Sequence, residues 1–201
     1  MSFEQHPEEK RLIEIVYDPS ASTYEKAHAA NRLAHGIWHR GDFGQALSFG
    51  VLAQELFEKI HDKLNVADSL FSQGDAHYGL KAYPEAMACY EQASSIFRSE
   101  VNQMMLARAC DRKAACLEEL GQPQQAAAGY LEATNLYVSL EDFDAAGYAC
   151  LNAAQELLKV DQFIEAELRA TQALEYFEKA ESETWLPDTY LVRGRALADQ
   201  Q

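Results

Sequence analysis

The sequence predicts an all-α solenoid of stacked helical hairpins, and three observations support this fold class. Small residues recur at a spacing of forty positions along the chain. Apolar residues follow a helical period on both sides of short polar breaks, as expected for pairs of amphipathic helices. The 201 residues include only 10 Gly and 5 Pro, and 48% are hydrophobic, which is typical of a folded protein rich in helix.

The second helix of each predicted hairpin carries two alanines and one ring. In the stretch YPEAMACYEQASSIF these are Ala86, Ala93 and Phe97. Alanine lets two helices approach closely where they cross, so leucine at either position is expected to overpack the crossing and cost about 1–3 kcal/mol. Steps of forty residues give three matching sets: Ala46, Ala86, Ala126 and Ala166; Ala53, Ala93, Ala133 and Ala173; and Phe57, Phe97, Tyr137 and Phe177.

The first helix of each hairpin is marked by a small residue about twelve positions before the first of these alanines. The breaks between the helices contain residues that suit helix ends: Gly41 and Gly121 suit a C-cap, and Pro84 and Pro123 suit a first turn. The small residues are Ala34, Gly74, Ala114 and Ala154, and three positions later come Ile37, His77, Leu117 and Leu157.

We expect one solenoid domain over residues 1–201, with four repeats at 23–62, 63–101, 102–141 and 142–181. Ser22-x-x-Glu25 predicts a capping box that opens the first repeat. Residues 1–22 are expected to hold a capping helix from about Glu8, because Tyr17 falls forty positions before Phe57.

The C-terminal segment, residues 182–201, has the register of a first helix. Gly194 falls forty positions after Ala154, and Leu197 falls forty after Leu157. The segment from about Pro187 to Asp199 is therefore predicted to form a half-repeat helix without its partner helix.

This pattern resembles the tetratricopeptide repeat family over nearly the whole chain. The family pattern W-x2-L-G-x2-Y, then A-x3-F, then A, corresponds to Leu70-x2-Gln73-Gly74-x2-His77, then Ala86-x3-Tyr90, then Ala93. It corresponds in the next repeat to Cys110-x2-Lys113-Ala114-x2-Leu117, then Ala126-x3-Tyr130, then Ala133. The period is forty instead of thirty-four, similar to vesicle-fusion adaptors of the SNAP type, kinesin light chains and bacterial peptide-sensing Rap-type proteins. Gly50 and Ala170 stand where the pattern has an aromatic residue.

The resemblance implies a right-handed solenoid whose first helices line a concave groove that binds a peptide or a helix of a partner protein. Basic side chains there would select an acidic peptide, and aromatic side chains would anchor it. The groove residues implied in this way are His28, Asn31, Arg32, His35, Trp38, His39, Phe71, Tyr78, Arg108, Arg112, Tyr148 and Asn152.

Other interpretations of these residues stay open. His28, Arg32, His35 and His39 form a stripe along one helix, which also fits a solvated surface. Two of its histidines are one turn apart, as in a metal site, but no third ligand is evident, so we expect no metal and no cofactor. The aromatic residues Trp38, Phe71 and Tyr78 could equally pack between repeats.

Composition narrows the class of partner. The chain carries 17 Lys and Arg against 32 Asp and Glu, a formal charge of −15, which disfavours nucleic acid and anionic membranes. No apolar run suits a signal peptide or a membrane span, so a cytoplasmic protein is expected. The four cysteines lack CxxC spacing, which favours buried thiols over disulfides.

We therefore expect a non-catalytic adaptor or scaffold, because no phosphate-binding loop or hydrolase motif is found in the sequence. One alternative is a peptide-sensing signalling receptor of Rap-like type. A second alternative is a structural subunit that forms a homo- or hetero-oligomer through its C-terminal helix, whose missing partner helix would leave an apolar face exposed.

Overall fold

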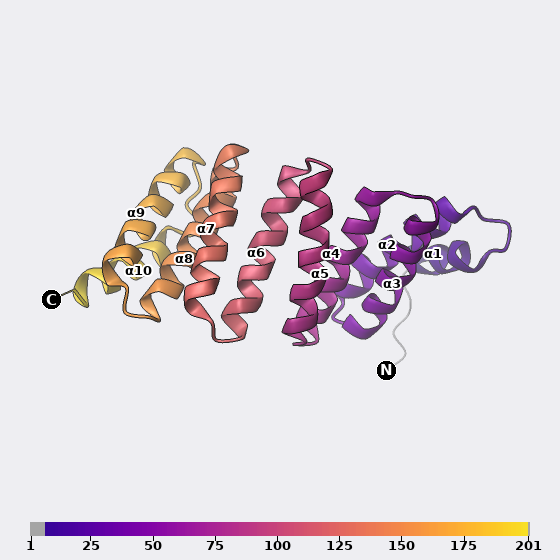
Figure 1. The fold of residues 1–201 in the computed structure, drawn as a ribbon, viewed down its shortest axis with the longest axis horizontal. Helices are drawn as coiled ribbons and strands as arrows, with labels where there is room; N and C mark the ends of the chain where they lie inside the picture. Colours follow the sequence, from indigo (N-terminus) through magenta and orange to yellow (C-terminus); the bar gives the residue numbers. More distant parts are fainter. Residues whose placement is uncertain (1–6, 201) are drawn as a thin grey trace. The chain divides into compact units, whose positions relative to one another are not determined.

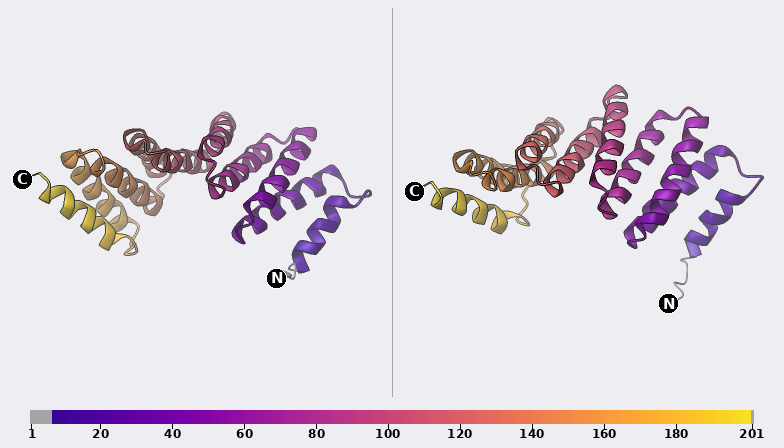
Figure 2. Two further views of the ribbon diagram at one scale, coloured as in Figure 1. Left: turned by 90° about the horizontal axis from the view of Figure 1, so that it is seen from below. Right: turned by 60° about the horizontal axis from the view of Figure 1, so that its bottom comes forward.

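The computed structural model describes residues 7–200, and within them the chain forms ten α-helices and no strand. It divides into two compact units, Met1–Glu100 and Val101–Gln201. Figure 1 labels the helices in chain order, and Figure 2 gives two further views.

Unit 1 holds α1 to α5, and each helix packs on the next. Leu12, Val16, Ile37 and Phe57 belong to its core. The helices are α1 (Pro7–Tyr17), α2 (Thr23–His39), α3 (Phe43–Lys59), α4 (Lys63–Gly79) and α5 (Tyr83–Ser99).

Unit 2 holds α6 to α10, again with each helix packed on the next, and α10 also touches α8. The helices are α6 (Gln103–Glu119), α7 (Pro123–Ser139), α8 (Phe143–Leu158), α9 (Phe163–Lys179) and α10 (Leu186–Ala198). Each predicted repeat thus contains one pair of helices, and α1 and α10 flank the four pairs.

The helices begin where side chains can cap them. Ser22 and Glu25 form the predicted capping box. Asp42, Asp62 and Asp142 each accept the backbone N–H three residues on, which satisfies one of the unpaired donors at a helix start. Helices α5 and α7 lack such a bond but carry the predicted proline in their first turn.

Eight turns share one backbone conformation, at positions spaced by twenty residues. The predicted caps Gly41 and Gly121 have positive φ angles of 82° and 69°. Each of the other six turns places a non-glycine residue in the same left-handed region: His61, Lys81, Val101, Glu141, Asp161 and Glu181, with φ between 52° and 60°. The N–H of Lys81 bonds the carbonyl of Tyr78, and the N–H of Ala82 bonds that of His77, the Schellman pattern that ends a helix.

Small residues allow the close helix crossings that the sequence predicts. Ala86 and Ala93 are fully buried, and a Cβ atom on Gly74 would lie 2.5 Å from Cε1 of Tyr90. Where the aromatic residue is replaced by Gly50, the Gln73 side chain fills the space and donates from Nε2 to the Gly50 carbonyl at 3.3 Å. All four cysteines are thiols, and all except the half-buried Cys89 are buried.

Candidate functional site

In unit 1, the stripe predicted on α2 divides into inward and outward side chains. His28 is half-buried, and its ring lies edge-on to Phe57 with centroids 5.0 Å apart. Asn31 Nδ2 donates to Asp68 Oδ2 on α4 at 2.8 Å. These two predicted groove residues therefore help hold α2 against its neighbours.

The remaining polar residues of the stripe are exposed. Arg32 pairs with Glu8 on α1, and both side chains are well solvated, so the pair adds little to stability. His35 and His39 lie with ring centroids 4.5 Å apart. Of the predicted stripe, these two histidines are the members that present their side chains to solvent without an ion pair.

The three aromatic residues predicted for unit 1 all make packing contacts. Trp38 Nε1 donates to the carbonyl of Asp75 at 3.0 Å and joins α2 to α4. Phe71 is 3% exposed and packs edge-on against Tyr90. Tyr78 is half-buried beside Tyr83. Because Phe71 is buried, its ring offers no surface to a peptide.

In unit 2, the two predicted arginines lie one turn apart on α6. Arg108 is exposed, and Nη1 contacts Met105 Sδ at 3.4 Å. Arg112 is half-buried next to Asp111. Burial raises the pKa of Asp111 from 3.8 to about 6, against the opposing charge of Arg112. Oδ1 of Asp111 is buried without a hydrogen-bond partner in this part of the chain, so its charge is costly to keep.

The predicted residues on α8 occupy the register of the two arginines. Tyr148 and Asn152 fall forty positions after Arg108 and Arg112. Tyr148 is exposed, and its ring centroid is 4.8 Å from that of Trp185. The sequence did not indicate this aromatic pair, because Trp185 precedes α10 by one residue and falls outside the helical period.

A partly buried polar cluster joins α6, α7 and α8. Lys159 Nζ donates to Glu118 Oε1 at 3.0 Å and also to Glu156, whose side chain is 1% exposed. Tyr130 donates its hydroxyl to Glu118 Oε2 at 2.9 Å. Burial alone would raise the pKa of Glu118, but the bonds from Lys159 and Tyr130 hold that pKa below its ordinary value. Burial raises the pKa of Glu156.

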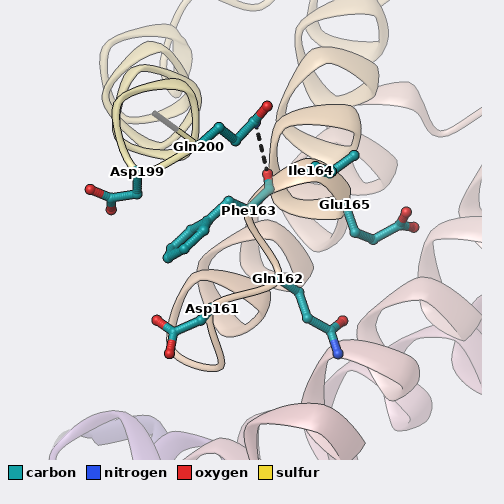
Figure 3. Close-up of a pocket in the computed structure, with 7 residues that line it drawn as sticks. All are labelled: Asp161, Gln162, Phe163, Ile164, Glu165, Asp199 and Gln200. Carbon is teal, nitrogen blue, oxygen red and sulfur yellow. Dashed lines mark hydrogen bonds between the residues drawn. The ribbon is translucent and has the colours of Figure 1, made fainter.

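A shallow pocket of about 580 Å³ lies where the start of α9 meets the end of α10 (Figure 3). Gln200 Nε2 donates to the carbonyl of Phe163 at 3.4 Å across it. Its acidic residues Asp161, Glu165 and Asp199 do not include any predicted site residue.

Residues 7–200 show neither a cluster of three metal ligands nor a membrane-spanning helix. Within that range no three His, Cys, Asp or Glu side chains come together as metal ligands would. No helix in the same range is long and apolar enough to cross a membrane.

Residues 25–99 match the family model of the tetratricopeptide repeat. The predicted resemblance is confirmed over these residues, which lie within the first two predicted repeats. No curated protein sequence matches the chain significantly.

Solved structures share the fold over most of this chain. RapI in its apo form gives a TM-score of 0.85 at 18% identity, covering 96% of this chain and 54% of RapI. Aspartyl phosphate phosphatase F from Bacillus subtilis gives 0.83 at 15% identity, covering 94% of this chain and 48% of that protein. A putative kinesin light chain from Podosopora anserina with TPR-like repeats gives 0.69 at 14% identity, covering 86% of each chain.

These likenesses confirm the predicted fold class, an all-α solenoid of helical hairpins. The identities of 14–18% show the fold alone. This chain spans about half the length of RapI and of the phosphatase.

Proposed function

Because the chain is a solenoid of tetratricopeptide-type hairpins, we propose that it is a non-catalytic adaptor that binds an acidic peptide or helix of a partner protein. Stacked helical hairpins offer extended surfaces suited to such ligands. The proposal rests mainly on unit 2, where Arg108 and Arg112 share a register with Tyr148 and Asn152.

Equivalent positions of the two hairpins in unit 2 carry different types of side chain: two arginines on α6, and a tyrosine and an asparagine on α8. Helix α7 packs against both α6 and α8, so we infer that equivalent positions of α6 and α8 face the same side. Arginine binds a carboxylate through a two-bond fork. The Tyr148 ring, supported by Trp185, offers an apolar contact, and the Asn152 amide can bond a peptide backbone.

In unit 1, the exposed pair His35 and His39 offers a separate polar surface, and the half-buried Trp38 lies beside His39 with ring centroids 4.9 Å apart. Tyr78 is half-buried on α4. Imidazole donates hydrogen bonds in either protonation state. We assign this pair a secondary role, because imidazole lacks the two-bond fork with which arginine binds a carboxylate.

Binding of an acidic peptide library, followed by fluorescence anisotropy, tests the assigned surface. The double variant Arg108→Glu with Arg112→Glu should abolish binding, because it replaces two attractive charges with repulsive ones. The matched control is Lys59→Glu with Lys81→Glu, two exposed residues of unit 1 whose replacement changes the net charge equally. Equal binding by both double variants would show that the assigned surface is wrong.

A second candidate is a peptide-sensing receptor of Rap-like type. The likeness to RapI and to aspartyl phosphate phosphatase F favours it. A receptor of this kind changes conformation when its peptide binds, so hydrogen exchange across the helices should change in the presence of a short peptide. Unchanged exchange with every peptide that binds would count against this candidate.

A further inference from the structure

Helix α2 presents two exposed histidines one turn apart. The rings of His35 and His39 lie with their centroids 4.5 Å apart and their planes at 74° to each other. No other two of the six histidines in the sequence are three or four positions apart. Residues four apart project from the same side of a helix, so the backbone of α2 itself holds the two imidazoles together.

Two imidazoles in this arrangement can bind one metal ion between them. Imidazole nitrogen suits copper, nickel and zinc. Zinc–nitrogen bonds of about 2.0–2.1 Å require the two coordinating nitrogens to lie about 3–3.5 Å apart. Rings whose centroids are 4.5 Å apart reach that separation by side-chain rotation, which is fast in exposed residues. The helix therefore does not need to change its backbone to form the chelate.

The surface around the pair has room for a hydrated ion. Gly36, which follows His35, is exposed, and a Cβ atom there would meet nothing within 4 Å. Among residues 7–200 no third His, Cys, Asp or Glu joins the pair, so water would complete the coordination shell, as it does at open zinc sites. Such a site has exchangeable positions that a carboxylate or an imidazole from outside the chain can also occupy.

The charges beside the pair are compatible with a bound cation. Arg32 is paired with Glu8 of α1. Arg40 is paired with Glu9 of the same helix, so both neighbouring arginines are neutralised. His39 lies in the last turn of α2, where the helix carbonyls favour positive charge. The formal charge of −15 over the whole chain also attracts cations.

We propose that His35 and His39 bind one late transition metal ion, through one ring nitrogen each, and that copper(II) is held most tightly. Copper ranks first because the affinity of nitrogen sites for divalent first-row metals is highest for Cu²⁺. Both imidazoles must be neutral to bind, so the affinity for the metal should fall as the pH decreases. The site does not depend on the adaptor function proposed above.

Titration calorimetry of the full chain without an affinity tag, using copper(II) chloride at neutral pH, tests the site. His35→Gln and His39→Gln should each weaken binding by about tenfold or more, because the second nitrogen of a chelate acts as an intramolecular ligand. The double variant should lose little more than either single variant. His61→Gln is the matched control, because His61 is exposed and has no histidine one turn away.

The fluorescence of Trp38 locates the ion. Its ring centroid is 4.9 Å from that of His39, and copper(II) quenches indole emission at such short range. Trp185→Phe leaves Trp38 as the one tryptophan of the chain, so its emission should fall as copper is added. The same titration with His39→Gln added should need about tenfold more copper.

Three results would overturn the proposal. The first is equal copper affinity in the wild type and in both single variants of the pair. The second is an equal loss of affinity in His61→Gln, which would mean that the histidines bind independently. The third is tight binding that leaves the emission of Trp38 unchanged, because the ion would then lie elsewhere on the chain.

Discussion

The ring of Tyr90 lies against the backbone of Gly74, where a Cβ atom would come within 2.5 Å of Cε1. The Tyr90 hydroxyl donates to Asp75 Oδ1 at 2.6 Å, which holds the ring in place on that crossing. The close approach of α4 and α5 therefore depends on the absence of a side chain at one position.

Gly74→Ala should lower the free energy of unfolding by about 1–3 kcal/mol, because overpacking outweighs the helix propensity that alanine adds. Urea denaturation followed by circular dichroism measures the change. Gly36→Ala is the matched control: this glycine of α2 is exposed, and a Cβ atom there would meet nothing within 4 Å. That variant should gain about 0.5–1 kcal/mol, and a similar gain from Gly74→Ala would contradict the assigned crossing.

The turn before α6 holds a β-branched residue in an unfavourable conformation. Val101 has φ of 58°, and the turn after the same helix has Gly121 at 69°. A left-handed residue with a Cβ atom costs about 1–2 kcal/mol, so Val101→Gly should stabilise the protein by about 1 kcal/mol after the added freedom of the unfolded chain is subtracted. Gly121→Ala should destabilise it by a similar amount. Thermal denaturation of both variants checks these two predictions. If the melting temperature moves in the same direction in both variants, this explanation is contradicted.

Much of the fold follows from local signals in the sequence. The forty-residue register predicts the helix pairs, and Ser22 with Glu25 predicts the first cap. The left-handed conformation of Val101 is not predictable in this way, because glycine is the residue that commonly signals such a turn in a sequence.

The candidate site was less predictable, because periodicity places a residue on a helix face but does not identify its partner. Asn31 is tied to Asp68, which is thirty-seven residues away in the chain. Arg32 likewise pairs with Glu8, a residue of another helix that is distant in the sequence. Such contacts arise from the way successive hairpins stack. The residue types alone therefore do not predict which side chains will pair.

Asp111 should make the stability of unit 2 depend on pH. Burial raises its pKa to about 6 from an ordinary 3.8, so the folded state binds a proton more tightly than the unfolded state. The stability that protonated Asp111 contributes is fully present below about pH 4 and is lost as the pH rises through 6. Asp111→Asn should therefore raise the free energy of unfolding by about 1–3 kcal/mol at neutral pH.

The gain from Asp111→Asn should disappear at about pH 4, where the wild-type carboxyl is protonated. Urea denaturation at a series of pH values measures the gain at neutral pH and its loss at about pH 4. Asp144→Asn is the control, because Asp144 is exposed at the start of α8, and it should show no such gain. A benefit from Asp111→Asn that is constant with pH would point to packing instead of charge.

Lys159 neutralises two carboxylates in unit 2, one of which, Glu156, has a side chain that is only 1% exposed. Lys159→Gln should destabilise the protein by about 1–3 kcal/mol at neutral pH, because Glu156 is left as a buried charge without its cation. Burial already raises the pKa of Glu156, so the loss should shrink as pH falls and the carboxyl takes up a proton.

Adding Glu156→Gln to the Lys159→Gln variant removes the stranded charge and should restore most of the lost stability. The coupling between the two substitutions is obtained from a double-mutant cycle, with urea denaturation of the wild type, both single variants and the double variant. A coupling near zero at neutral pH would mean that Lys159 acts through Glu118 alone. In that case Glu118→Gln, which also removes the acceptor of the Tyr130 hydroxyl, should be the substitution that couples to Lys159→Gln.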